Sequence, residues 1–223
     1  MDSLVCDDLY IEMPKGFIVF ISGVPGVGKT TISYELLKMF DAFRIVEETD
    51  LIREVLRGYS DYIKDVFKDK AQFLFEEIDI AHSSKFLTYN DAKMQCEHMK
   101  KSLEKIIVRQ KRKGISTIIN GVHIVPDVLN GIFDNEGIIY FNLLVNNELA
   151  LMDRWKNRDQ SKYTTANLST AFQTNIALYE SMEKLSDKTT YLFNNIDVTD
   201  LNIEQTKIIV RRCIANRLQS FLA

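Results

Sequence analysis

One glycine-rich stretch has the residue types and spacing needed to hold phosphate groups, Gly23-Val24-Pro25-Gly26-Val27-Gly28-Lys29-Thr30. It matches the pattern G-x-x-x-x-G-K-S/T in full. Glycines let the backbone curl around an anion with its N–H groups pointing inward, and the following helix adds partial positive charge. Lys29 is expected to reach the β- and γ-phosphates, and the Thr30 hydroxyl to ligate Mg²⁺. The motif predicts binding of ATP and Mg²⁺ through Gly23, Pro25, Gly26, Val27, Gly28, Lys29, Thr30 and Thr31.

The phosphate motif does not by itself distinguish a kinase from an ATPase or a GTPase. A GTPase would need a base-reading motif such as N-K-x-D late in the chain, and the sequence has none. A helicase-type ATPase would need a carboxylate after the third predicted strand, where this chain has Asn120-Gly121-Val122-His123. Activation of water would then lack its usual base, which favours transfer of the phosphoryl group to an acceptor.

A second group of candidate residues follows the second predicted strand, at Thr49-Asp50. Ligands of α/β proteins gather at the carboxyl ends of the strands, so this edge should face the phosphate loop. Asp50 could accept the proton of an acceptor hydroxyl or hold a Mg²⁺-bound water; alternatively it only caps the next helix. Arg53, one turn on, could hold an anionic acceptor or could be solvated or ion-paired.

Arg154 and Arg158 are four residues apart and share one face of a predicted helix over residues 148–158. A polar stretch follows, which is typical of a helical lid over residues 154–167 that closes on phosphates. Arginines in such a lid neutralise charge in the transition state, so both are candidate catalytic residues. The alternative is that they pair with Asp153 and Asp159 at the surface.

The elements that position these residues alternate between strands and helices. Apolar runs predict strands at 17–21, 43–47, 115–119, 137–145 and 190–193. Helical periodicity predicts helices after 30, after 50 to near Gly58, at 91–113, 148–158, 165–185 and about 201–221, with Asn146 as a candidate N-cap. The alternation predicts a parallel sheet between two helix layers. Residues 1–16 are expected to form an N-terminal arm, and 17–223 one domain.

Composition is that of an ordinary globular chain of 223 residues, with 46% hydrophobic and 26% charged residues. The net charge of −3 argues against a general nucleic-acid binder without excluding one. Three scattered cysteines, Cys6, Cys96 and Cys213, are interpreted as reduced thiols. The sequence has no apolar run of 18 residues and no apolar signal core at its N-terminus. These features predict a cytoplasmic protein without a membrane span.

Four blocks together resemble 2-phosphoglycerate kinase and its relatives: ISGVPGVGKTT, TDLIREVLR, the Ser83-Ser84 segment and INGVHIVP. The resemblance covers roughly residues 17–160. It implies a P-loop NTPase fold of the adenylate-kinase-like group, a three-layer α/β sandwich with a five-stranded parallel core sheet and a helical lid. The implied activity is ATP-dependent phosphorylation of 2-phosphoglycerate to 2,3-bisphosphoglycerate.

Residue by residue, the resemblance implies unequal roles. The phosphate-loop glycines, Lys29 and Thr30 match directly. Asp50 matches the acceptor-side acid and Arg53 a ligand of the acceptor's phosphate. His123 falls in the GVH block and could contact the substrate or make structural hydrogen bonds. Ser83 and Ser84 could line the acceptor site or form a plain loop. The chain departs from the family at Asn120, where relatives tend to have glutamate.

The sequence therefore predicts an ATP- and Mg²⁺-dependent kinase that phosphorylates a hydroxyl of a small anionic metabolite, with 2-phosphoglycerate as the leading candidate. Two alternatives stay open. One is a kinase for a nucleotide sugar or a polynucleotide end. The other is a nucleotide-binding regulator with little turnover, which the amide at Asn120 favours. The basic stripe Lys101, Lys105 and Arg109 is read as a solvated helix face, with RNA as its rival partner. The sequence leaves the oligomeric state open.

Overall fold

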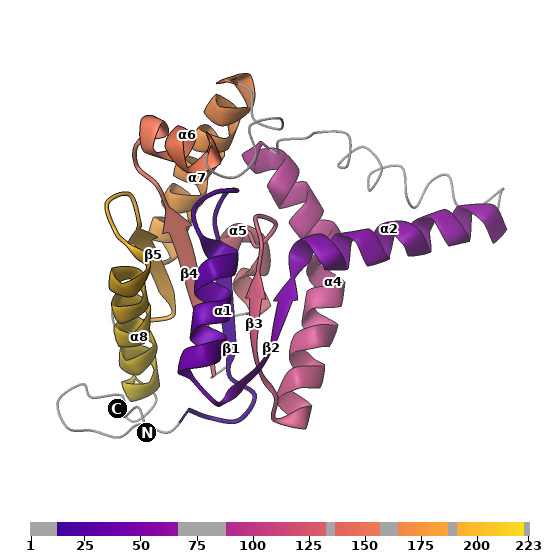
Figure 1. Cartoon of the computed structure of the whole chain (residues 1–223). Helices are drawn as coiled ribbons and strands as arrows, with labels where there is room; N and C mark the ends of the chain where they lie inside the picture. The colour runs from indigo at the N-terminus through magenta and orange to yellow at the C-terminus, as the bar shows by residue number, and fades with distance from the viewer. Residues whose placement is uncertain (1–12, 67–87, 133–136, 157–164, 187–190, 221–223) are drawn as a thin grey trace.

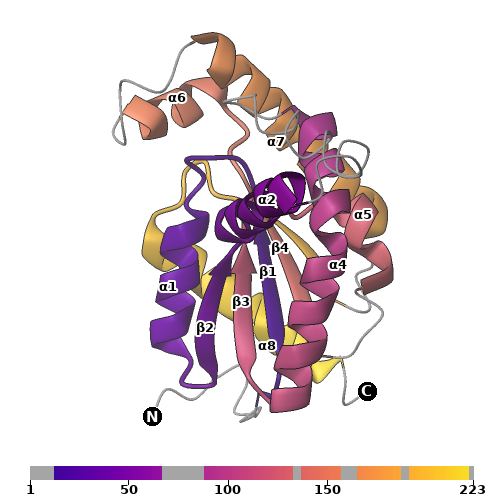
Figure 2. The ribbon, with the colours of Figure 1, turned by 90° about the vertical axis from the view of Figure 1, so that its right-hand side faces the viewer.

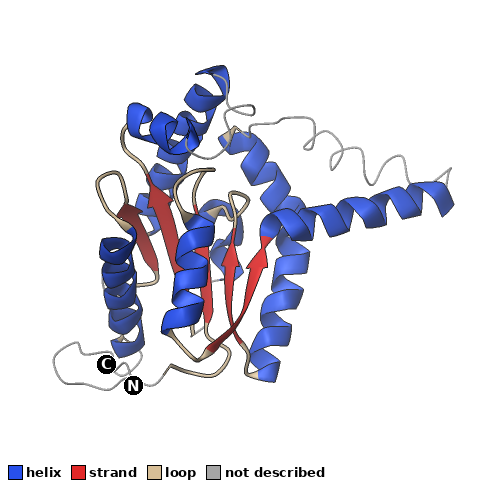
Figure 3. Cartoon of the chain, in the orientation of Figure 1, coloured by secondary structure: helices blue, strands red, loops and turns tan. Residues whose placement is uncertain are grey.

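The computed structural model describes residues 13–66, 88–132, 137–156, 165–186 and 191–220, and side chains at 63–66 and 165–166 are left out. Strands and helices alternate along these residues, as Figures 1 and 3 show. The elements are β1 (Ile18–Ser22), α1 (Lys29–Met39), β2 (Phe43–Glu48), α2 (Thr49–Val66), α4 (Tyr89–Lys113), β3 (Ser116–Asn120), α5 (Pro126–Leu129), η1 (Asn130–Ile132), β4 (Ile138–Leu144), α6 (Glu148–Lys156), α7 (Thr165–Leu185), β5 (Phe193–Asp197) and α8 (Ile203–Gln219).

In the described residues, five strands form one parallel sheet in the order β2-β3-β1-β4-β5. Every residue of β1, β3 and β4 is buried, because helices cover both faces of a parallel sheet. Asn120 ends β3, pairing with Ile21 of β1 on one side and Glu48 of β2 on the other. The predicted parallel α/β architecture is confirmed, and the residues that follow β1, β2 and β3 share one edge.

Two helix layers enclose the sheet, as a comparison of Figures 1 and 2 makes clear. The first layer contains α1 and α8, which contact each other. The second contains α4, α5 and α7. Two further helices of the described residues lie at the carboxyl ends of the strands: α6 lies above the loop between β1 and α1, and α2 leaves the end of β2 sideways (Figures 1 and 2). This edge therefore carries the elements that hold those candidate residues that the structure describes.

The long helix predicted at 91–113 is α4, and its two ends have clear local causes. Thr88 caps its first turn: the Thr88 hydroxyl accepts from the Asp91 N–H, and the Asp91 carboxylate accepts from the Thr88 N–H. Gly114 ends it in the left-handed conformation, with a φ of 66°. The predicted stop at this glycine is confirmed.

Three local predictions were wrong. The helix expected to end near Gly58 continues to Val66, because one glycine inside a helix costs only about 1 kcal/mol relative to alanine. The last strand is Phe193–Asp197 rather than 190–193; hydrogen bonds satisfy its asparagines, as between Asn142 Nδ2 and Asn195 Oδ1 at 2.9 Å. The side chain that caps α6 belongs to Asn147, which accepts from the Leu149 N–H at 2.9 Å.

The described part of the chain contains no helix long and apolar enough to cross a membrane. Most of the predicted arm, residues 1–12, lies outside the described residues, as does much of the predicted lid, at 157–164.

Candidate functional site

The loop between β1 and α1 has the backbone shape expected of an anion cradle. Gly23, Gly26 and Gly28 have φ angles of 136°, 91° and 101°, a region that disfavours residues with a Cβ atom. Gly28 is the N-cap of α1, and its lack of a side chain leaves the first-turn N–H groups without a side-chain acceptor. A helix start of this kind attracts a negatively charged group. The loop therefore fits the phosphates of a nucleotide.

Lys29 and Thr30 open α1 at the foot of this loop, and both are half-buried. The Lys29 ammonium donates to the Val24 carbonyl at 2.9 Å, which holds it over the loop. Thr31 is exposed. The loop and the first turn of α1 thus bring the lysine and the threonine of the motif together, and their roles towards ATP and Mg²⁺ stay predictions.

Trp155 on α6 packs directly onto the phosphate loop. Its indole N–H donates to the Pro25 carbonyl at 2.7 Å, and the side chain is buried. A Cβ atom on Gly26 would lie 2.5 Å from the indole ring, so this contact requires glycine. The loop is therefore braced from above by α6. Because Trp155 is the one tryptophan in the sequence, its fluorescence reports on the loop.

Arg154 lies beside Trp155, and its guanidinium joins three segments. It donates to the Val27 carbonyl of the phosphate loop at 3.5 Å, and to the Val198 and Thr199 carbonyls after β5, the latter at 3.2 Å. Desolvation by burial lowers the pKa of Arg154, while Asp197 and Asp200 oppose this shift. The arginine occupies backbone acceptors in this structure, and its predicted lid role stays a prediction. Its predicted partner Arg158 lies outside the described residues.

We expect the substitution Arg154→Ala to lower the free energy of unfolding by about 1–3 kcal/mol, because partly buried carbonyls lose their donor. Urea denaturation measures this change. Lys156→Ala, at an exposed position of the same helix, should stay within about 0.5 kcal/mol of the wild type. The lid hypothesis predicts the opposite pattern, in which kcat falls while the unfolding free energy is unchanged.

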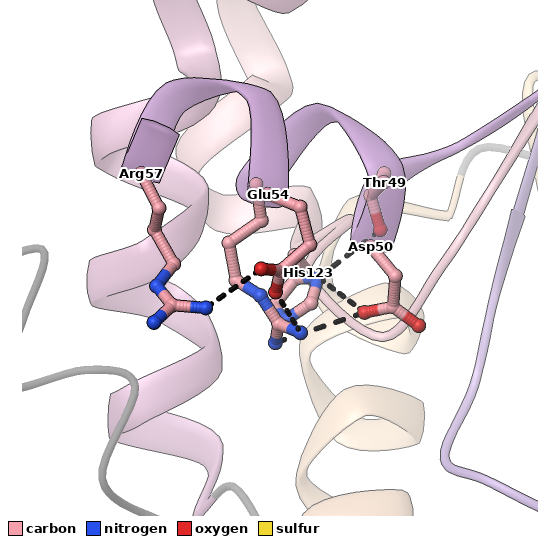
Figure 4. Close-up of polar contacts among 6 residues, drawn as sticks. Thr49, Asp50, Glu54, Arg57 and His123 are labelled. Carbon is pink, nitrogen blue, oxygen red and sulfur yellow. Dashed lines mark hydrogen bonds and ion pairs between the residues drawn. The ribbon is translucent and has the colours of Figure 1, made fainter. Parts of the chain in front are cut away.

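A cluster of polar side chains stands across the same edge, at the start of α2 (Figure 4). His123, in the loop after β3, lies with Nδ1 3.1 Å from Thr49 Oγ1 and Nε2 3.4 Å from Arg53 Nη1. Asp50 Oδ1 lies 3.7 Å from both His123 Nδ1 and Arg53 Nη1. The Asp50 carboxylate is 66% exposed, and it belongs to the first turn of α2 rather than to its N-cap. Three predicted site residues therefore meet: Asp50, Arg53 and His123.

Gly121 makes this cluster possible. Because Glu48 pairs with Asn120 in the sheet, the next residues of the two strands, Thr49 and Gly121, pass close together. A Cβ atom on Gly121 would lie 1.7 Å from Thr49 Oγ1, and the glycine has a φ of 159°. Thr49 was not among the predicted site residues. Its signal in the sequence was its place beside Asp50 at the end of a predicted strand.

His123 is fully buried, and burial lowers its pKa to about 4. Asp50 acts to raise this pKa, and the charges of Arg53 and Lys29 act to lower it. The ring is therefore neutral at physiological pH. Its predicted role as a direct substrate contact stays a prediction.

This pKa has a consequence for stability. The unfolded chain takes up a proton on His123 near pH 6.5 while the folded protein does not, so acid favours unfolding. We expect the contribution of neutral His123 to the free energy of unfolding to be fully present above pH 6.5. It should decrease by about 3 kcal/mol as the pH falls to 4. Denaturation of the wild type and of His123→Gln across this range tests it, because other groups cancel in the difference. An identical pH dependence in both proteins would contradict the assignment.

Asn120 ends β3 beside the phosphate loop, where the resemblance had implied an acid. Its buried side chain donates to Ser33 Oγ at 3.0 Å, and Ser33 Oγ donates to the Lys29 carbonyl at 2.9 Å. The amide thus ties the sheet to the first turns of α1. Ser33 carries no motif signal and was missed.

The structure does not place the other predicted residues at this edge of the sheet. Ser83 and Ser84 lie outside the described residues. Lys101, Lys105 and Arg109 are exposed on α4, and Lys101 pairs with Glu104 at 3.1 Å. The carbonyls of Val198 and Thr199 were missed because a backbone acceptor has no signal in residue type.

No family model matches the chain. Curated relatives do, over parts of their length. The chain is 32% identical to a 2-phosphoglycerate kinase from Thermococcus kodakarensis over 114 residues, which cover 48% of this chain and 37% of the relative. It is 26% identical to the 2-phosphoglycerate kinase of Methanopyrus kandleri over 177 residues, which cover 76% of this chain and 51% of the relative. The chain thus spans about half or less of these relatives' length.

Several solved structures with similar folds are named as kinases. A sugar kinase from Janibacter has a TM-score of 0.57 at 16% identity and covers 92% of this chain and 97% of its own. A gluconokinase from Sinorhizobium meliloti has a TM-score of 0.55 at 13% identity, with 94% and 97% covered. Thymidylate kinase from Candida albicans has a TM-score of 0.52 at 11% identity, with 94% and 95% covered. The chain therefore has the α/β fold of P-loop kinases, and in sequence it is similar to the 2-phosphoglycerate kinases.

Proposed function

We propose that this chain is a cytoplasmic kinase that transfers the γ-phosphoryl group of ATP to a hydroxyl of a small anionic metabolite, with 2-phosphoglycerate as the leading candidate. One observation carries the proposal. The phosphate loop and the Asp50–Arg53–His123 cluster lie at the same edge of the sheet, close enough for the charge of Lys29 to act on His123. The names of the curated relatives supply the candidate acceptor.

The residues at this edge fit Mg²⁺ bound together with a nucleotide. Thr30 offers a hydroxyl and Asp50 an exposed carboxylate, which are the hard oxygen ligands that Mg²⁺ prefers. Among the described residues no group of three His, Cys, Asp or Glu side chains could hold a metal ion. This suits Mg²⁺, which kinases usually hold with one or two carboxylates, substrate phosphates and water. The ion, when bound, neutralises charge on the phosphates.

The protein's own residues would then have separate roles in binding the phosphates, accepting the proton and binding the acceptor. The loop N–H groups and Lys29 hold the phosphates in line for transfer, and positioning of this kind accounts for most of the rate in phosphoryl transfer. Asp50, exposed and next to the loop edge, takes the proton of the acceptor hydroxyl. Arg53 binds the anionic group of the acceptor.

ADP release in the presence of ATP and Mg²⁺ tests the proposal. The acceptor panel contains phosphorylated three-carbon acids, nucleosides, nucleotide sugars and RNA ends. We expect release with a phosphorylated three-carbon acid, most strongly with 2-phosphoglycerate. Release only with a nucleotide sugar or an RNA end would replace the proposed acceptor class.

A second candidate is a nucleotide-binding regulator with little turnover. Asn120 favours it, because a neutral amide can neither take a proton nor hold Mg²⁺-bound water as a carboxylate does. A Trp155 fluorescence change on adding ATP, with no ADP release for any acceptor, would support this candidate over the kinase.

A further inference from the structure

The buried ring of His123 is held at both of its nitrogens, and the chemistry of its partners decides where its proton lies. An arginine guanidinium has only N–H donors, so Nε2, at 3.4 Å from Arg53 Nη1, must act as an acceptor. The proton of the neutral ring is then on Nδ1. From there it is donated to Thr49 Oγ1 at 3.1 Å, with Asp50 Oδ1 next at 3.7 Å.

Burial supports the same assignment. His123 is 0% exposed, and a proton on Nε2 would point at the Arg53 guanidinium. Thr49 lies close to the chain at Gly121, where an added Cβ atom would lie only 1.7 Å from the threonine hydroxyl oxygen. The ring therefore contacts Thr49 through Nδ1 and presents the lone pair of Nε2 to Arg53.

Arg53 receives this lone pair in a half-buried position, with 24% of its side chain exposed. Its Nη2 contacts Glu54 Oε1 at 3.2 Å, and Arg57 holds Glu54 from the other side at 2.6 Å (Figure 4). Arg53 Nε is buried and has no hydrogen-bond partner among the described residues. The guanidinium is thus oriented on two sides, and the exposed part of its side chain remains able to contact an anion.

We propose that His123, as the neutral Nδ1–H tautomer, is a positioning residue that orients Arg53 towards the anionic group of the acceptor. This inference rests on the proposed function. It also limits the acceptor class: a phosphate or carboxylate must sit near the hydroxyl that is phosphorylated. Neutral sugars and nucleosides would offer Arg53 no anion beyond the carboxylates of Asp50 and Glu54 that it already contacts.

Two amide substitutions separate the two ring contacts. His123→Asn places an amide N–H near the position of Nδ1 and keeps the donor to Thr49, but it removes the acceptor for Arg53. His123→Gln is longer and can place its carbonyl oxygen near the position of Nε2. We expect His123→Asn to raise the KM for the phosphorylated acceptor about tenfold or more, because a hydrogen bond to a charged group is lost. His123→Gln should restore that KM to within about threefold of the wild type.

Both variants should keep their nucleotide affinity, measured by Trp155 fluorescence, and their kcat should change less than KM. An equal rise of KM in both variants, or no rise in His123→Asn, would overturn the positioning role. A loss of nucleotide affinity as large as the rise in the KM for the acceptor would also overturn it. The ring would then stabilise the nucleotide site as well as the position of Arg53.

A second measurement does not need turnover. Calorimetry follows the binding of inorganic phosphate to protein saturated with Mg²⁺ and a non-hydrolysable ATP analogue. We expect weaker phosphate binding in His123→Asn than in the wild type, and recovery in His123→Gln. If the wild type releases no ADP with any acceptor but this order of affinities holds, the proposed function fails and the anion site stands. Equal phosphate affinities in all three proteins would overturn the inference by themselves.

Discussion

Lys29→Ala should reduce phosphoryl transfer by at least about 10²–10³-fold, the cost of removing one preorganised group that stabilises developing charge. The ammonium is held over the phosphate loop by its bond to the Val24 carbonyl, 2.9 Å away, where it can contact the transferring group. The fold should persist, because the change leaves the loop backbone intact and removes hydrogen bonds worth about 1 kcal/mol each. Steady-state ADP release and a thermal melt measure the two effects.

Lys38→Ala is the matched control. Lys38 lies on the same helix, is exposed, and pairs with Glu35 at 2.8 Å, well away from the loop. It should keep normal turnover, since an exposed ion pair contributes about 0–1 kcal/mol. Turnover of Lys29→Ala within about threefold of the wild type would remove the phosphate loop from the mechanism.

Asp50→Asn should lower kcat by about 10²-fold or more while leaving nucleotide affinity and the melting temperature nearly unchanged. The two side chains are nearly the same size, and the carboxylate is 66% exposed, so packing around it does not change. An amide can neither take the proton of the acceptor hydroxyl nor bind Mg²⁺ as strongly as a carboxylate. Steady-state kinetics, Trp155 fluorescence and melting curves give the three quantities.

Asn120 provides the comparison, because it lies at the end of the neighbouring strand and has an amide group where Asp50 has a carboxylate. Asn120→Ala should lose about 1 kcal/mol of stability, since its buried bond to Ser33 Oγ at 3.0 Å disappears, and its kcat should fall far less than in Asp50→Asn. An active Asp50→Asn together with an inactive Asn120→Ala would reverse the roles of the two residues. Normal activity in both would place the chemistry elsewhere.

The elements that could be predicted from the sequence are those with a local cause. The phosphate loop could be predicted from eight consecutive residues, because its glycines, Lys29 and Thr30 are close together in the sequence. The end of α4 follows from one glycine in the left-handed conformation. The strands β1, β3 and β4 follow from short apolar runs, because both faces of a parallel sheet are covered. β5 was misplaced, because two consecutive asparagines that form hydrogen bonds across the sheet separate its buried residues Phe193 and Ile196.

The candidate acceptor site depended on tertiary structure, because strand order and close contacts are long-range properties. Thr49 and His123 are 74 positions apart in the sequence, and they meet only because β2 pairs with β3 and Gly121 admits the threonine. Arg154 illustrates the same point. Residue type alone could suggest an arginine for a phosphate lid, but only the packing of α6 brings it to the carbonyls of Val198 and Thr199. The sequence by itself thus determined which groups could bind phosphate, and the fold decided which of them face each other.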